Sequence, residues 1–95
     1  MKLPLSFEMT TTLEDFRRLL PAAVGYVPFV EEGSAFVHHE GKRGWRIALT
    51  PLPKLKAGLM RLERHRLDFQ FEGYTEAEVA AFMKRFEMYF RRGGG

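Results

Sequence analysis

The sequence predicts an α+β domain in which two helices cover one face of a single, mostly antiparallel sheet. Two stretches, residues 12–20 and 75–92, space their apolar residues three and four apart, which is the period of an amphipathic helix. Five other stretches alternate apolar with polar residues or are rich in β-branched and aromatic residues, and turn-forming residues separate them. In chain order, the elements read β-α-β-β-β-β-α.

The first strand and the start of the first helix follow from alternation and capping. Residues 2–9 place four apolar side chains on one face, namely Leu3, Leu5, Phe7 and Met9. Thr12 can then cap a helix, with Asp15 three residues further on. Thr11 with Glu14 offers the same spacing one residue earlier.

Proline and glycine set the expected end of this helix and the strands after it. Pro21 and Gly25 should stop the helix or break it. Residues 26–32 and 35–40 read as two strands joined through a turn at residues 32–34.

The next two strands have less certain limits. Residues 45–50 form a strand with alternating faces, and we expect the following Pro-Leu-Pro to end it. Residues 59–71 are extended, but their apolar phase slips between Leu62 and Leu67, which implies a bulge or a short turn near residues 63–65. This stretch is therefore either one bulged strand or two strands.

The C-terminal helix has the clearest signature. Thr75 and Glu78 have the spacing of a capping box. Six apolar residues then share about 120° of helical arc, and they are Val79, Phe82, Met83, Phe86, Tyr89 and Phe90. Gly93 follows as a natural stop. We expect one domain over residues 1–92 and a flexible glycine tail at residues 93–95.

Two resemblances accompany this pattern. The order of elements resembles that of TATA-binding-protein-like domains and of some helix-grip-like domains, although a fold does not fix a function. The C-terminal stretch "FEGYTEAEVAAFMKRFEMYFRRGGG", with the earlier "GLMRL", resembles a group of short bacterial proteins that end in a similar aromatic helix and glycine triplet. That group has no known function, so the resemblance implies no residue roles.

Composition excludes several classes of protein. The chain has 95 residues, 45% of them hydrophobic, and no cysteine, so disulfides, thiolate catalysis and cysteine-bound metals are excluded. The first twelve residues lack the apolar run that is typical of a signal peptide, and no apolar stretch approaches the roughly 18 residues of a membrane span. We therefore expect a soluble cytoplasmic protein that makes no contact with a membrane. The net charge of +3 is uneven, because residues 42–71 carry eight basic and two acidic side chains.

The stretch "HHEGKRGWRI", residues 38–47, looks most like chemistry, but it predicts a hairpin. His38 and His39 are neighbours, so in a strand they face opposite ways and do not readily bind one ion together. We expect one exposed and one partly buried histidine. The glycines beside Lys42 and Arg43 suit a turn, and the spacing is not that of a phosphate-binding loop.

Catalytic patterns are weak. Neither serine lies in a nucleophile motif. The acidic pairs at residues 14–15 and 31–32 are explained by solvation. We expect no catalytic residues, no metal site and no cofactor, and therefore a protein that is not an enzyme.

The basic segment supplies the candidate site. Arg46 and Arg66, with Arg64, are predicted to lie on the sheet face that the helices leave uncovered, with Lys42 and Arg43 in the nearby turn. This face mixes charges of both signs, which suits recognition of a partner protein or a second copy of the chain in a homodimer. A plain solvated face is the competing interpretation.

Two other functions stay open. The first alternative is nucleic-acid binding through residues 42–71, which positive charge favours and the absence of interleaved aromatic residues disfavours. The second alternative is a carrier of a small apolar ligand beneath the C-terminal helix.

Overall fold

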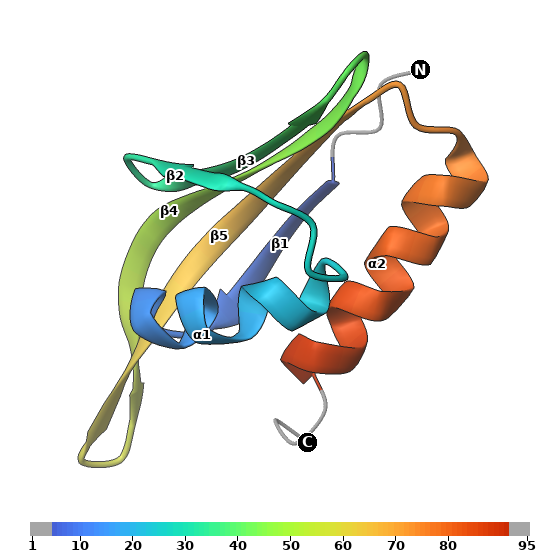
Figure 1. Cartoon of the computed structure of the whole chain (residues 1–95). Coiled ribbons are helices and arrows are strands. Elements are labelled where there is room, and N and C mark those ends of the chain that lie inside the picture. The colour runs from blue at the N-terminus through green and yellow to red at the C-terminus, as the bar shows by residue number, and fades with distance from the viewer. Residues whose placement is uncertain (1–4, 92–95) are drawn as a thin grey trace.

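The computed structural model describes residues 5–91, and it has the expected α+β architecture (Figure 1). The elements are β1 (Leu5–Thr10), α1 (Leu13–Ala23), β2 (Val30–Glu32), β3 (Ala35–Glu40), β4 (Arg43–Ala57), β5 (Met60–Glu72) and α2 (Glu76–Arg91). Every strand pairing is antiparallel, and the strand order is β1-β5-β4-β3-β2. The glycine tail at residues 93–95 and the domain limit at residue 92 fall outside the described residues.

Short turns and one helical crossover create this strand order. β2, β3, β4 and β5 follow one another through two-residue turns, each with glycine first at positive φ, namely Gly33-Ser34, Gly41-Lys42 and Gly58-Leu59. α1 carries the chain from β1, at one edge, to β2 at the other edge. β1 then pairs with β5, with Phe7 opposite Leu67.

Both helices pack on the same face of the sheet, which we call the inner face. Phe16 of α1 contacts Phe36 of β3, and Phe86 of α2 contacts Phe69 of β5 at a centroid distance of 5.0 Å. Phe16 and Phe86 also meet each other, so one aromatic cluster joins the two helices to the sheet. All six residues of the predicted stripe on α2 belong to this core or pack against it, which confirms that the stripe is core.

Capping decides where the helices begin. Thr12 accepts a hydrogen bond from the Asp15 backbone N–H at 3.0 Å, as the sequence predicts. The capping box of α2 also forms: Glu78 accepts from the Thr75 N–H at 2.9 Å, and Thr75 accepts from the Glu78 N–H at 3.1 Å. Each pair satisfies backbone donors that have no partner within the helix.

Proline does not end α1 as the sequence suggests. Pro21 lies inside the helix, which continues to Ala23. Only one intrahelical hydrogen bond is lost there, because Pro21 stands in the last turn and its carbonyl still accepts from the Tyr26 N–H at 2.8 Å. Gly25 and Tyr26, both at positive φ, complete the stop.

The prediction that Pro-Leu-Pro ends the strand at residue 50 is wrong. β4 runs through both prolines to Ala57. The Leu49 N–H donates to the Ser34 carbonyl, at 2.9 Å, on the side of β4 that faces β3. The nitrogen of Pro51, two residues further on, points to the same side. β3 does not extend as far as Pro51, so the N–H that proline lacks would have had no acceptor in β3.

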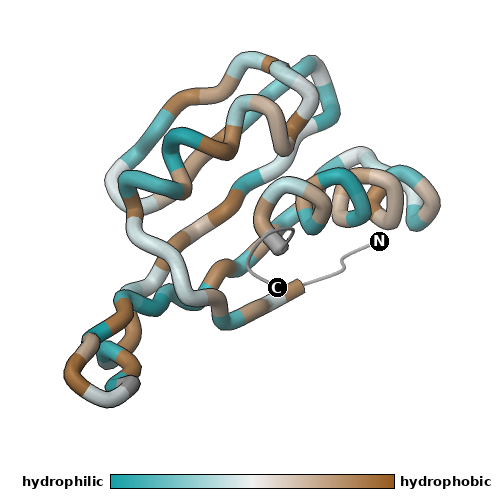
Figure 2. Tube along the Cα trace, turned by 90° about the horizontal axis from the view of Figure 1, so that it is seen from below, coloured by the Kyte–Doolittle hydropathy of each residue, from teal (hydrophilic) through white to brown (hydrophobic). Residues whose placement is uncertain are grey.

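Residues 60–72 form one strand, which settles the open question about the apolar phase. The bulge lies in the neighbouring strand: Pro53 and Lys54 of β4 stand opposite the single residue Glu63 of β5. Beyond this bulge the two strands continue as a hairpin, residues 54–62, that we call the arm. The arm projects away from both helices (Figures 1 and 2).

Candidate functional site

The register places the three predicted arginines together on the outer face, the side of the sheet opposite the helices. Arg66 lies between Glu8 of β1 and Thr50 of β4, and Arg64 lies one row along. Arg46 of β4 stands opposite Gln70 of β5. Their in-strand neighbours Ile47, Leu67 and Trp45 are buried on the inner face. The alternation of β4 and β5 therefore separates the core from a polar surface, as expected.

Two of these arginines are already paired. The Arg64 guanidinium lies 2.5 Å from a Glu8 carboxylate oxygen, and the Arg66 Nε lies 3.2 Å from an Asp68 carboxylate oxygen. No ion pair or hydrogen bond of the Arg46 side chain is found within residues 5–91. The outer face is thus a surface of mixed charge with one uncommitted guanidinium at its centre.

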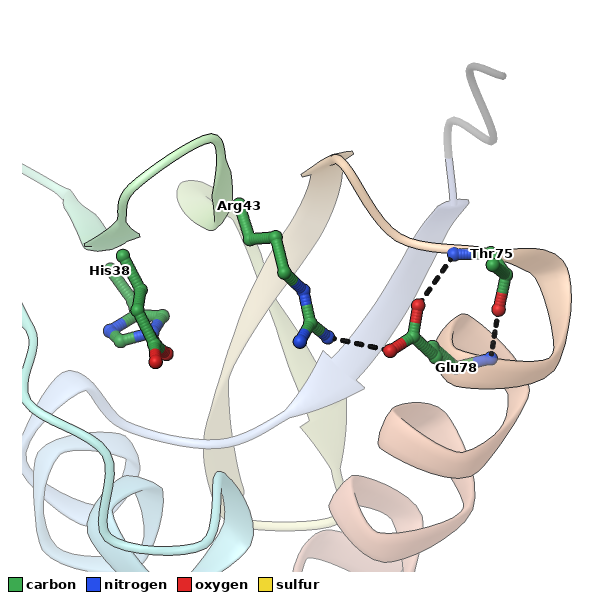
Figure 3. Close-up of polar contacts among 5 residues, drawn as sticks. His38, Arg43, Thr75 and Glu78 are labelled. Atoms are coloured by element: carbon green, nitrogen blue, oxygen red, sulfur yellow. Dashed lines mark hydrogen bonds and ion pairs between the residues drawn. The ribbon is translucent and has the colours of Figure 1, made fainter.

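Arg43 points elsewhere. Its guanidinium reaches around the β3–β4 turn to Glu78 at the start of α2, at 2.8 Å (Figure 3). It also lies 4.5 Å from the centroid of the Tyr74 ring. The pKa of Glu78 is lowered, chiefly because its carboxylate accepts the backbone N–H of Thr75. Burial raises the pKa of Tyr74. Arg43 therefore ties the turn to the helix, while Lys42 stands exposed in the turn.

The neighbouring glycine also departs from expectation. Gly44 was expected to supply positive φ to the turn, but it is a paired residue of β4, opposite His39. A Cβ at this position would lie 2.5 Å from the His38 carbonyl oxygen, so only glycine allows the strands to approach this closely.

The histidines behave as structural residues. His38 is buried against Trp45, and its Nδ1 meets the Pro28 carbonyl oxygen. His65 is buried too, with its Nδ1 2.9 Å from the Thr11 carbonyl oxygen. His39 is exposed, so the expected split between neighbouring histidines is confirmed. Within residues 5–91 no group of three or more His, Cys, Asp or Glu side chains could hold a metal ion.

The arm is the feature that sequence reasoning missed. At its tip the Leu59 side chain is fully exposed, and Met60 is 62% exposed. Lys56 and Arg61 face each other across the ladder just behind the tip. The sequence did contain a signal for the arm. Met60 and Leu62 are even-numbered, like the outer-face residues Arg64 and Arg66, so their side chains lie on the outer face and not on the core side of the strand.

A shallow depression of about 230 Å³ lies at the β2–β3 edge. Its lining comes from Pro28, Phe29, Val30, Val37 and His39. Val37 and His39 stand on the outer face, so the depression is separate from the space beneath α2 where a ligand carrier was considered.

Comparisons with known proteins identify no family for the chain. No protein-family model matches it, and no curated protein and no solved structure matches it significantly. The resemblance of the C-terminal stretch to short bacterial proteins therefore stays a prediction. No helix within residues 5–91 is long and apolar enough to cross a membrane.

Proposed function

We propose that the chain is a non-enzymatic interaction module that pairs with a second copy of itself through the outer face. The observation that carries this proposal is the charge sequence along β5. Its outer-face residues are basic at one end, with Arg64 and Arg66, and acidic toward the other, with Asp68 and Glu72.

Such a strand is complementary to itself when two copies meet antiparallel. A two-fold axis near the middle of β5 would bring the basic half of one copy over the acidic half of the other. The pairs that Arg66 and Asp68 make within one chain would then become parts of a larger network, in which each charge gains an opposite neighbour. A purely basic face, as a nucleic-acid surface requires, would repel its own copy.

Small side chains let two faces approach. The row that contains Asp68 continues through Ala48 of β4 to Ala35 of β3, and Ser6 flanks it on β1. Arg46, for which no ion pair is found within the described part of the chain, lies beside this row. These features favour contact with another flat surface over contact with a grooved duplex.

Two complementary variants test the proposal. Arg64→Glu with Arg66→Glu makes the outer side of β5 acidic, and Asp68→Lys with Glu72→Lys makes it basic. Light scattering on a size-exclusion column should find the unchanged chain as a dimer whose fraction rises with concentration. Each variant alone should be monomeric because like charges then meet, and a mixture of the two should form a heterodimer.

An uncharged variant separates folding from association. Ala48→Gln enlarges the centre of the outer face, so it should lower dimerisation while circular dichroism shows an unchanged fold. Finding the unchanged chain as a monomer at every concentration would rule the proposal out. So would a dimer that Ala48→Gln and both charge variants leave intact.

A further inference from the structure

The arm combines two features that the outer-face dimer does not use. Apolar side chains occupy its tip and one side, namely Leu55, Leu59, Met60 and Leu62, of which Leu59 is fully exposed. Two cations, Lys56 and Arg61, stand directly behind the tip, and a third, Lys54, stands at the base of the arm in the bulge. The nearest acidic residue is Glu63, which lies opposite the bulge just outside the arm.

Exposed apolar residues at the end of a projecting hairpin are costly in water. The molecule extends over 47 Å along its longest axis but only 27 and 23 Å along the others. Figure 2 shows the arm standing apart from both helices, and within the described residues 5–91 the Leu59 side chain is fully exposed. A fully exposed leucine contributes nothing to the core, so its burial against a partner would be favourable.

From this arrangement we propose that the arm docks the protein on an anionic lipid surface, with Leu59 and Met60 in the interface and the three cations against lipid phosphates. The Lys56–Arg61 pair is followed by one more pair and the turn. At about 3.3 Å per residue, the tip reaches about 7 Å beyond Lys56 and Arg61. That distance matches the depth to which interfacial segments enter the boundary between headgroups and acyl chains.

Other occupants fit less well. A nucleic acid offers the phosphates but would meet the apolar tip before the cations, and the arm carries no aromatic side chain on which a base could stack. A second copy of the arm would bring six cations together. The sequence predicts no membrane contact because only spanning segments and signal peptides are visible there, whereas surface docking needs a short apolar tip beside basic residues.

Vesicle sedimentation with the full chain tests the proposal. The probes are vesicles of phosphatidylcholine alone and vesicles that also contain phosphatidylglycerol. The chain should bind only the anionic vesicles, and binding should weaken as salt rises. Replacing Lys54, Lys56 and Arg61 by Gln should weaken binding about a hundredfold, since each basic residue near such a surface is worth about 1 kcal/mol.

The apolar tip needs its own variant. Leu59→Ser with Met60→Ser should weaken binding at least about tenfold, because it removes the only side chains that enter the acyl boundary. Met88→Ser is the matched control, since Met88 on α2 is 57% exposed and lies away from the arm. Lys42→Gln with Lys84→Gln removes two positive charges away from the arm and so controls for most of the change in net charge. Neither control should lower binding by more than about twofold.

A tryptophan at the tip gives an independent readout. Trp45 is buried in the core, so the emission of a Leu59→Trp variant should shift to the blue on anionic vesicles through the new residue alone. The proposal fails if the chain does not bind anionic vesicles. It also fails if the tip variant binds them as well as the unchanged chain does, or if duplex DNA competes with equal affinity. Either of those two results would identify a general polyanion site.

Discussion

The two ends of the β4–β5 ladder use the same kinds of residue in different ways. At the body end, Trp45 and Ile47 of β4 pair with Phe71 and Phe69 of β5, and all four are buried beneath the helices. At the arm end, Leu55 pairs with Leu62, and the tip that follows is exposed. One hairpin therefore contains both the centre of the core and the most exposed apolar side chain among residues 5–91.

The difference shows that pairing and burial are separate. Backbone pairing holds β4 and β5 together on both sides of the bulge. The helices, however, cover only the inner face of the body, and neither helix reaches the arm (Figure 1). The bulge at Pro53 and Lys54 lies at the boundary between the two regions. Apolar residues in the body should therefore govern stability, and those in the arm should govern binding.

The largest effect should come from the core of the body. Phe69 contacts the rings of Phe7, Phe71, Phe82 and Phe86, so Phe69→Ala should lower the free energy of unfolding by about 3–5 kcal/mol. Denaturant titration followed by circular dichroism measures this. A loss below about 1 kcal/mol would mean that the aromatic cluster is loosely packed.

A pair of glycines compares the two regions directly. Gly44→Ala should cost about 1–3 kcal/mol, because the new Cβ would lie 2.5 Å from backbone and the strands must separate. Gly58→Ala, at the arm turn with φ of +64°, meets no atom within 4 Å and should cost about 1 kcal/mol from backbone strain alone. The same denaturant titration measures the loss of unfolding free energy in both variants. Equal losses would contradict the expected difference between the body and the arm.

The capping box of α2 should give a smaller, pH-dependent effect. Thr75→Ala should cost about 1 kcal/mol. The folded-state pKa of Glu78 is lowered, chiefly by the hydrogen bond from the Thr75 N–H, so its stabilisation is present above the unfolded pKa and is lost as pH falls through the folded one. The unchanged chain should therefore melt higher than Glu78→Gln at pH 7, and the difference should begin to shrink below about pH 4.3 and vanish only once the pH is below the folded-state pKa. If the melting temperatures of the two proteins differ by the same amount at every pH, the Glu78 carboxylate does not stabilise the start of α2 in this way.

The smallest effect on stability should come from the arm tip. Leu59→Ser should change the free energy of unfolding by less than about 0.5 kcal/mol, since the side chain has no cover to lose. Thermal melting compares it with the unchanged chain. A large loss would show that the arm folds back onto the body, and the contrast between the two regions would disappear.

Local physics fixed the features that the sequence predicts well. Thr12 and Thr75 cap their helices because their hydroxyls reach backbone N–H groups only three residues away. The alternation of apolar and polar residues over residues 45–50 shows which side chains face the core and which face away from it, because side chains alternate between the two sides of a strand. The outer-face position of Arg46 and Arg66 follows from the same alternation once both helices lie on one side.

Only the tertiary structure decided the features that depend on where a neighbour ends. Pro51 is tolerated in β4 because β3 stops short of it, and the end of β3 is not encoded near the proline. Met60 and Leu62 lie outside the core because they share the outer face, the side of the sheet that neither helix covers. Arg43 turned to Glu78 because α2 begins beside the turn. Hydrogen-bond parity and side-chain periodicity can be read from the chain itself, whereas burial depends on elements that are distant in sequence.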